Sequence, residues 1–310
     1  MKVDFRDIDI NAELSAAENN EIVKSASQVE RLANFRQQRQ RGIALPWEKL
    51  SGRFEIHKGQ LCLLGGFSGH YKTTLSTQIA LHAMKQGYRV GIASLELEVP
   101  ELLEQFLSIA SGTEQPPMPW CEQALQWADD KLFLYDRIDA ITPDEAIQMI
   151  IAFHKFRGCD LVVLDALMMT GVCQDTEREQ QFSQTVAAVA KKFNIAVLML
   201  HHMRKPHGPE GEHKVPGKYD FIGSSHLVNI AHSVLIGWHN KKKAADFNNG
   251  KPVDDNDPDY VLSVAKQRSG RYEGMAGLWL SRECRAFCST SQRRVAPLEF
   301  NGNAITGGME

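Results

Sequence analysis

From about residue 46 to residue 202 the chain alternates apolar runs with segments whose apolar residues recur every three or four positions. Continuous apolar runs are typical of strands buried on both faces, and the three-to-four period is typical of helices that bury one face. The segments expected as strands are 60–66, 89–95, 131–136, 159–167 and 195–202. The segments expected as helices are 73–86, 99–111, 142–157 and 177–193. This alternation predicts a mostly parallel sheet with helices on both faces.

After about residue 232 the pattern changes to one strand after another, in the runs SVLIGW, YVLSVAK and MAGLWL. Successive strands without intervening helices favour antiparallel pairing, so these runs are expected at one edge of the sheet. Two polar segments, 203–222 and 240–258, are expected as loops, with the lysine triplet 241–243 as a solvated turn.

The segment 14–41 is polar, favours a helix and ends in a basic stretch. Because it carries few apolar residues, it is expected either as a solvated arm or as an arm that packs on another subunit. The predicted organisation is therefore a helical arm or linker at 1–45, an α/β domain at 46–295 and a tail at 296–310.

The composition is that of an ordinary globular domain, with 43% hydrophobic and 24% charged residues in 310 positions. No apolar run approaches the roughly 18 residues of a membrane helix, and the first residues carry acids, so neither a membrane anchor nor a signal peptide is expected. Six scattered cysteines without a CxxC pair favour reduced thiols and a cytoplasmic location. A net charge of −3 means that any nucleic-acid site must be a local basic patch.

The strongest chemical signal follows the first expected strand, in the run GGFSGHYKTT at 65–74. Small residues at the start of a helix let backbone N–H groups surround a phosphate, a lysine reaches the β- and γ-phosphates, and a hydroxyl holds Mg²⁺. Lys72 and Thr73 fit the last two roles. One residue departs from the pattern, because Tyr71 stands where a glycine is expected. The residues expected around the phosphates are Gly66, Ser68, Gly69, His70, Tyr71, Lys72, Thr73 and Thr74.

Two further strands end in acids, as a nucleotide site of this kind requires. The run DLVVLD ends in Asp165, about 90 residues after Lys72, and is expected to hold Mg²⁺. The run ASLELE places Glu96 to polarise the attacking water, with Glu98 as the alternative. Each acid alone is equally consistent with a solvated loop residue.

Six segments together resemble the motor domain of DnaB-family (superfamily 4) hexameric replicative helicases, and especially the helicase half of phage primase-helicases and Twinkle. The carrying segments are, in order, GGFSGHYKTTLSTQIA, SLELEVPELLEQFLSIASG, DLVVLDALMMTG, FNIAVLMLHHMRKP, GSSHLVNIAHSVLIGWHNK and AKQRSGRYEG. The resemblance covers residues from about 46 to 290 and implies a RecA-like P-loop core that hydrolyses ATP with Mg²⁺.

The resemblance also implies roles for single residues. Lys72 and Thr73 would serve the phosphates and Mg²⁺, Glu96 would be the catalytic carboxylate, and Asp165 the Walker B acid. His202 takes the position of the γ-phosphate sensor. The remaining residues carried over are Lys266 and Arg268, which match the basic pair that enters a neighbouring subunit's site, and Arg204 and Lys205, which match the segment facing the central channel.

Single-stranded DNA in a ring needs cations on loops that face the axis. The segment after 202 carries Arg204, Lys205, Lys214 and Lys218, which fits such a loop, although a solvated surface loop has the same composition. Four histidines in the same part of the chain match no zinc spacing. The expected partners are single-stranded DNA, further copies of the chain in a hexamer, and a separate primase or loader, because no primase or zinc-ribbon segment precedes the motor.

Two functions remain. The first is a ring helicase that translocates on single-stranded DNA in phage or plasmid-type replication. The second is a RecA-like DNA-dependent ATPase that does not unwind and acts as a recombination or loading accessory. Tyr71 and the short N-terminal region favour the second function. The pair Lys266 and Arg268 and the basic loop favour the first.

Overall fold

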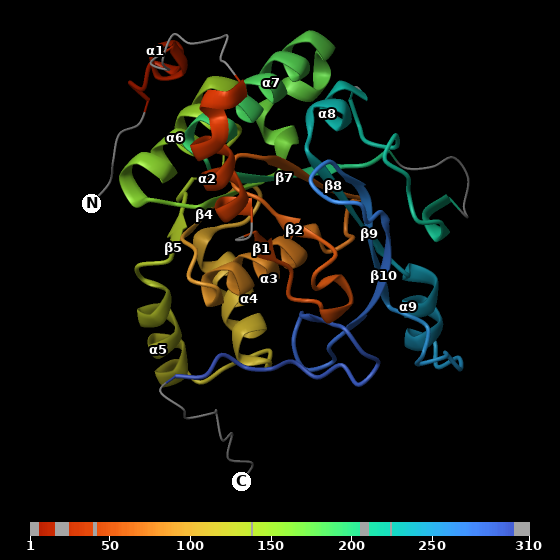
Figure 1. Cartoon of the computed structure of the whole chain (residues 1–310). Coiled ribbons are helices and arrows are strands. Elements are labelled where there is room, and N and C mark those ends of the chain that lie inside the picture. Colours follow the sequence, from red (N-terminus) through yellow and green to blue (C-terminus); the bar gives the residue numbers. More distant parts are fainter. Residues whose placement is uncertain are drawn as a thin grey trace.

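The computed structural model describes residues 6–15, 25–39, 42–137, 139–204, 211–223 and 225–300. Within them a nine-stranded sheet has the order β11-β10-β9-β8-β3-β7-β6-β4-β5, and a two-stranded sheet joins β1 to β2 (Figure 1). The strands of the large sheet are β3 (Leu61–Gly66), β4 (Val90–Ser94), β5 (Leu132–Leu134), β6 (Leu161–Asp165), β7 (Ala196–His202), β8 (Ser233–His239), β9 (Tyr260–Gln267), β10 (Gly274–Leu280) and β11 (Phe287–Cys288). Those of the small sheet are β1 (Ile43–Ala44) and β2 (Glu55–Ile56).

Helices cover both faces of the large sheet (Figure 1). One face packs on α3 (Lys72–Lys85), α4 (Val99–Ser111) and α5 (Met118–Ala128). The other packs on α6 (Pro143–Arg157), α7 (Thr176–Phe193) and α8 (Ser225–Ile230). Side chains alternate along β3, so Cys62 and Leu64 join the first core, and Leu61 and Leu63 join the second. The predicted mostly parallel sheet with helices on both faces is confirmed.

Local sequence explains several element ends. Thr142 caps α6 by accepting a hydrogen bond from Glu145 N–H, while Glu145 Oε2 accepts one from Thr142 N–H at 2.8 Å. Gly158 ends the same helix in the left-handed region at φ 65°. These signals fix where the helix begins and ends before any tertiary contact is made.

The edge strands correct part of the sequence prediction. The run SVLIGW forms β8, which pairs parallel to β3, so it extends the parallel sheet and only β9, β10 and β11 are antiparallel among the described strands of this sheet. The lysine triplet does not form a solvated turn, because it begins α9 (Lys241–Asn248). In α9, Lys243 Nζ lies 2.8 Å from Asp259 Oδ1, and its side chain is only 9% exposed. Asn240 caps this helix, because its side chain accepts a hydrogen bond from Lys243 N–H. The prediction of a turn rested on composition and did not take this cap into account.

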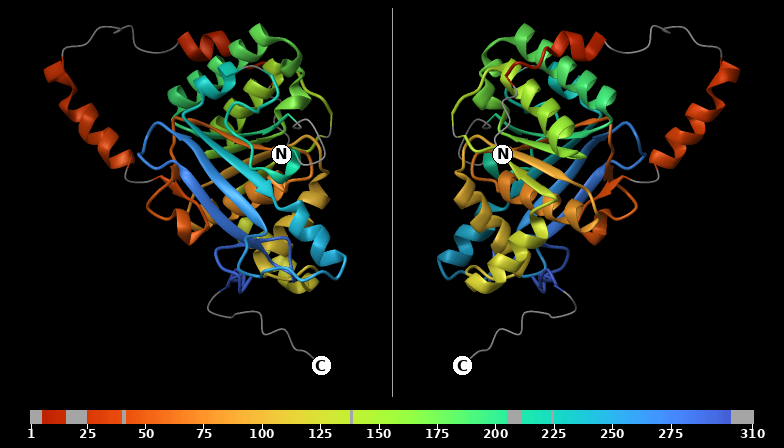
Figure 2. Two further views of the ribbon diagram at one scale, coloured as in Figure 1. Left: turned by 90° about the vertical axis from the view of Figure 1, so that its right-hand side faces the viewer. Right: turned by 90° about the vertical axis from the view of Figure 1, so that its left-hand side faces the viewer.

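The segments near the two ends of the described chain pack on the domain, whereas α2 (Val29–Arg39) does not. Near the N-terminus, α1 (Ile10–Ser15) packs on α6 and α7. Near the C-terminus, Leu298 is buried in the core, and its N–H donates to Ala110 O. By contrast, α2 projects from the body, as Figure 2 shows, and its described side chains are almost all exposed. No helix among the described residues is long and apolar enough to cross a bilayer.

Candidate active site at the carboxyl edge of the sheet

The parallel strands β3, β4, β6 and β7 bring the predicted site residues to one edge of the sheet. Gly66 pairs with His202 at the end of β7, and Ser94 pairs with Asp165 at the end of β6. Glu96 follows β4 by two residues, and Lys72 begins the helix after β3. Residues that are far apart in sequence therefore meet where open α/β sheets bind their ligands.

The phosphate-binding loop, residues 67–71, makes its turn in two left-handed steps. Gly69 has φ 73°, and Tyr71, directly before α3, has φ 53°. The second value explains why a glycine is expected at position 71, since a side chain there carries a steric cost. A side chain at Gly66 is excluded for a different reason, because its Cβ would lie 2.9 Å from Gly237 O and 3.2 Å from Lys72 Cγ.

Within this loop, His70 is turned into the protein. Its ring is fully buried, and Nδ1 accepts a hydrogen bond from His239 N–H at 3.0 Å. Its carbonyl accepts from the Tyr260 hydroxyl at 2.9 Å. Burial lowers the pKa of His70 to about 4, so the ring is neutral at physiological pH. The side chain thus fixes the loop to β8 and the carbonyl fixes it to β9, so the His70 ring is turned away from the proposed phosphate position.

Lys72, His202 and Glu96 form a connected row. Lys72 Nζ donates to Phe67 O at 3.1 Å and lies 3.3 Å from His202 Nδ1. Because the ammonium has only protons to give, Nδ1 accepts, and Nε2 carries the ring proton toward Glu96 Oε1, 3.6 Å away. Burial lowers the pKa of Lys72, with Asp165 and Glu96 opposing the shift. His202 as a hydrogen-bond donor lowers the pKa of Glu96, which keeps that carboxylate ionised.

Thr73 and Asp165 form the second pair. The Thr73 hydroxyl donates to Asp165 Oδ2 at 2.6 Å, and Asp165 is only 2% exposed. Burial raises the pKa of Asp165 to about 6. A buried carboxylate and a hydroxyl in contact at the start of a helix are hard oxygen donors of the kind that Mg²⁺ prefers, and a cation there would offset the cost of the buried charge.

The other predicted residues are placed less directly. Ser68 is exposed at the tip of the loop, whereas the Thr74 hydroxyl faces α4 and accepts from Gln105 Nε2 at 2.5 Å. Glu98, the alternative to Glu96, is the N-cap of α4, and its N–H donates to Glu101 Oε2 at 3.2 Å. The structure therefore brings Glu96, and not Glu98, next to Lys72 and His202.

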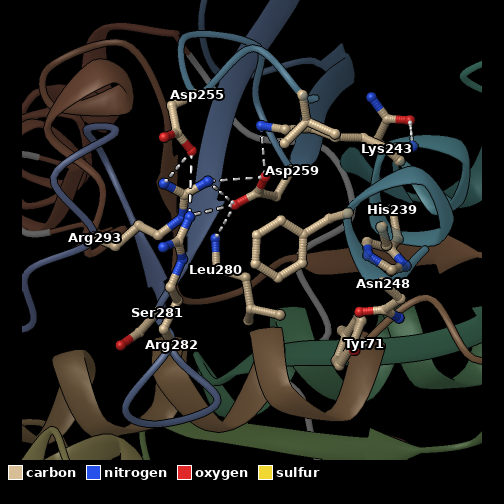
Figure 3. Close-up of a pocket in the computed structure, with 14 residues that line it drawn as sticks. Tyr71, His239, Lys243, Asn248, Asp255, Asp259, Leu280, Ser281, Arg282 and Arg293 are labelled. Atoms are coloured by element: carbon tan, nitrogen blue, oxygen red, sulfur yellow. Dashed lines mark hydrogen bonds and ion pairs between the residues drawn. The ribbon is translucent and has the colours of Figure 1, made fainter. Parts of the chain in front are cut away.

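A hollow of about 240 Å³ opens beside Tyr71 (Figure 3). The Tyr71 ring packs edge-on against His239, with centroids 5.0 Å apart, and against Phe287 at 5.8 Å. The far wall is an ion-pair network, in which Arg293 lies 3.0 Å from Asp259 and 3.1 Å from Asp255. Sequence reasoning missed this wall because its members come from α9, the segment just before β9 and the segment after β11.

Lys266 and Arg268 lie at the opposite edge of the sheet. In β8, Ser233 pairs with Cys62 at the start of β3 on one side and with Gln267 of β9 on the other. Lys266 and Arg268, which flank Gln267, therefore lie at the amino end of β3. Lys266 Nζ donates to three carbonyls at the end of α8, those of Val228, Asn229 and Ala231. Arg268 is exposed, and its guanidinium donates to Asn229 O. Burial first, then Arg268 and Lys218, lower the pKa of Lys266 to about 8.

Arg204 is exposed directly after β7 and donates from Nη2 to Gly223 O at 2.8 Å. Its partner in the prediction, Lys205, lies outside the described residues. The expected channel segment is therefore described at its start and at its return, which includes Lys214 and Lys218.

Comparisons with known proteins agree with this arrangement. A family model described as the DnaB-like helicase C terminal domain matches residues 47–287. The chain belongs to this family. It is an ATP-dependent helicase domain, and this family assignment does not favour the non-unwinding alternative. A search of curated proteins finds no match.

Solved structures show the same fold. One similar structure is titled as an ATPase domain, with a TM-score of 0.69 and 15% identity, covering 86% of this chain and 99% of that one. Another is titled "The Structure Of A DnaB-Like Replicative Helicase And Its Interactions With Primase", with a TM-score of 0.67, 15% identity, and coverage of 90% of this chain and 70% of that one. The RecA-like P-loop core that was predicted from the sequence is confirmed.

Proposed function

We propose that this DnaB-like domain hydrolyses ATP with Mg²⁺ at the carboxyl edge of the sheet and uses the energy to move along single-stranded DNA as a ring. The observation that carries the proposal is the convergence of Lys72, His202, Glu96, Thr73 and Asp165 from four parallel strands. Each has the chemistry that phosphoryl transfer needs, and transfer of this kind depends on positioning and charge stabilisation.

The roles follow from the contacts. The N-terminus of α3 and the Lys72 ammonium bind the phosphates, and the γ-phosphate draws Lys72 from its present acceptor, Phe67 O. Glu96, ionised and within 3.6 Å of His202, orients the attacking water and accepts its proton. Thr73 and Asp165 would hold Mg²⁺, which supplies positive charge to the phosphate oxygens. His202 lies between Lys72 and Glu96 and can report whether a γ-phosphate is present.

The hollow beside Tyr71 is the place for the nucleoside. A nucleotide whose phosphates lie at the start of α3 extends past Tyr71, the residue before Lys72. The volume of about 240 Å³ is small for a whole ligand but suits a base with its sugar partly in solvent. Phe247 and Arg282, whose guanidinium carbon lies 5.1 Å from the Phe247 ring, offer flat surfaces for such a group.

Assembly into a ring, with six subunits as the family's number, is proposed on two features. Arg268 lies beyond the amino end of β3, so a strand length of about 13 Å separates it from the P-loop of its own chain, at about 3.3 Å per residue. A role in hydrolysis therefore requires a neighbouring subunit. The second feature is α2, which exposes Val29, Leu32 and Phe35 together and would bury them on a neighbour. Head-to-tail contacts of this kind form a ring when the rotation from one subunit to the next closes on itself.

DNA would follow the ring axis along Arg204, Lys205 and the rest of the segment up to Lys218. A separate primase or loader would act together with this domain. One of the similar structures is titled for its interactions with primase, which makes a primase the first partner to test. The free thiols of all six cysteines suit the proposed cytoplasmic location.

The deciding experiment combines two assays on the same sample. We expect single-stranded DNA to stimulate ATP turnover and a forked duplex with a 5′ single-stranded arm to be separated only when ATP and Mg²⁺ are present. Lys72→Ala is the matched control, since it removes the main cation for the γ-phosphate. Turnover that single strands do not stimulate would contradict the proposal. If DNA stimulates turnover but neither a 5′-armed nor a 3′-armed fork is separated, the domain is the non-unwinding DNA-dependent ATPase instead of a helicase.

A further inference from the structure

The segment 220–223 returns to the site from the proposed channel loop and runs alongside the end of β7. Ile222 N–H donates to His202 O at 3.1 Å, and Arg204 N–H donates to Asp220 O at 2.7 Å. The returning segment is therefore tied by its backbone to the residue that faces Lys72 and Glu96, and to the first residue of the proposed DNA segment.

Gly223 ends this segment in a left-handed conformation that favours glycine. Its φ is 90°, and a Cβ built on it would overlap Glu179 Oε2 and lie 2.8 Å from Glu179 Cδ. The Glu179 carboxylate thus lies directly against the α-carbon of Gly223. On the other side, the Gly223 carbonyl accepts the hydrogen bond from Arg204 Nη2 at 2.8 Å.

Glu179 is fully buried, which is unusual for a carboxylate. It lies in the first turn of α7, and α7 follows the short segment after β6, the strand that ends in Asp165. The Gly223 turn is consequently held between two elements that each carry a nucleotide-site residue. These elements are β7 with His202, and the β6–α7 unit with Asp165.

We infer that Glu179 is a positioning residue that couples the nucleotide site to Arg204, and this inference rests on the proposed function. A γ-phosphate that shifts His202 also shifts the carbonyl to which Ile222 is bonded. Because the Glu179 carboxylate fills the space on the far side of Gly223, the turn cannot relax away from β7 and follows it, and the carbonyl that orients Arg204 follows too. Without the carboxylate the turn relaxes on its own, and Arg204 no longer responds to the nucleotide.

Coupling between the nucleotide site and the DNA site is a free energy and must be reciprocal: ATP changes DNA affinity by the same factor by which DNA changes ATP affinity. We expect the wild type to bind a single strand more tightly with a non-hydrolysable ATP analogue than without it, by a factor in the usual range of about 5–150. In Glu179→Ala this factor should fall to between about 0.5 and about 2, whether it is measured as the effect of ATP on DNA affinity or of DNA on ATP affinity. A factor near one means that the coupling has been lost.

Three further variants make the test specific. Gly223→Ala should also lose the coupling, since its Cβ displaces the carboxylate, and the double variant should lose no more than either single variant, because one contact is removed in each case. Glu179→Gln keeps the length of the side chain and should retain most of the factor. Glu177→Ala, an exposed acid in the same helical turn, is the control and should behave as the wild type.

The ratio separates positioning from mere stability, because a partly unfolded sample lowers the number of sites without changing a ratio of affinities. A wild-type factor that persists in Glu179→Ala and in Gly223→Ala overturns the inference. If Glu179→Ala does not fold, Gly223→Ala decides. A wild type that binds no single-stranded DNA in either state would instead refute the proposed function.

Discussion

At the scale of single residues, the site depends on groups whose charge states are set by burial and by nearby charges and hydrogen-bond donors. His202 lowers the pKa of Glu96, whereas burial raises the pKa of Asp165 to about 6. Two carboxylates near the same lysine thus have different chemistry, as acid–base pairs in active sites often do.

Glu96→Gln should leave ATP binding intact and reduce turnover by at least about 100-fold, since the water-activating carboxylate is lost and the phosphate cradle is not. Binding is measured by calorimetry and turnover by phosphate release. Glu98→Gln is the matched control, and its turnover should be unchanged because Glu98 caps α4. If Glu98→Gln is the inactive variant, the catalytic carboxylate has been assigned to the wrong residue.

Asp165→Asn should make the metal-free protein more stable while removing Mg²⁺-dependent turnover. The pKa of Asp165 is raised from 3.8 to about 6, so between these pH values the folded chain holds a proton that the unfolded chain has lost. Stability must then fall as pH rises from about 4 to about 6, and the ionised group costs up to about 3 kcal/mol at pH 7. Urea unfolding at pH 4 and pH 7 in EDTA checks this. Equal pH dependence in the variant and the wild type would refute it.

Tyr71→Gly should bind ATP as well as the wild type or better. The ring packs outside the phosphate turn, on His239 and Phe287, so it is tolerated there and the left-handed backbone is its main cost. Tyr71→Ala is the matched comparison, because it loses the ring and keeps the strain, which is worth roughly 1 kcal/mol relative to glycine. A glycine variant that binds ATP much more weakly than the wild type would mean that contact between the ring and the nucleoside outweighs the backbone strain.

At the scale of elements, strand ends decide function. β7 ends in His202 on the nucleotide side and continues directly into Arg204 on the proposed DNA side, so one strand joins the two sites. The antiparallel strand β9 does the opposite, since its reversal puts Lys266 and Arg268 at the far edge. A parallel β9 would have brought both cations to the P-loop edge of the same chain.

Arg204→Ala should weaken binding to single-stranded DNA. It should also reduce the slope of log affinity against log salt by about 0.7, the value for one phosphate contact on a single strand. Fluorescence anisotropy at several salt concentrations measures both. Lys251→Ala, which removes an exposed charge paired with Asp246, is the control and should leave the slope as it is. Parallel salt plots for Arg204→Ala and the wild type would remove Arg204 from the DNA path.

At the scale of the whole molecule, the proposed ring divides one active site between two chains. An arginine that enters across an interface stabilises charge on the transferred phosphoryl group, and such fingers are worth about 10³–10⁵ in rate. Arg268 is suited to this because it is exposed and its guanidinium donates to the Asn229 carbonyl, a neutral acceptor that a phosphate oxygen can replace. Arginine also stays charged where the pKa of Lys266 falls to about 8.

Mixing two inactive variants tests this division. Lys72→Ala subunits keep the finger and lose the P-loop cation, and Arg268→Ala subunits do the reverse. Each alone should be nearly inactive, but in mixed rings some Arg268→Ala sites face a Lys72→Ala neighbour and regain both parts, so ATPase activity should return. Native mass spectrometry confirms that mixed rings form. Mixed rings without activity would mean that Arg268 does not work across the interface.

Local patterns predicted the five strands and four of the helices between residue 60 and residue 202, because periodicity, caps and glycines act within a few residues of chain, but they did not predict α5 (Met118–Ala128). The sequence also indicated which strand ends carry chemistry, since Lys72, Glu96, Asp165 and His202 each lie at or just after the end of an apolar run. Tertiary structure alone decided which of Glu96 and Glu98 reaches His202, that β8 pairs parallel to β3, and that α9 replaces a turn. It also decided the buried contact of Glu179 with Gly223 and the distance of Arg268 from its own P-loop. These depend on pairings between residues far apart in the chain, which no local pattern encodes.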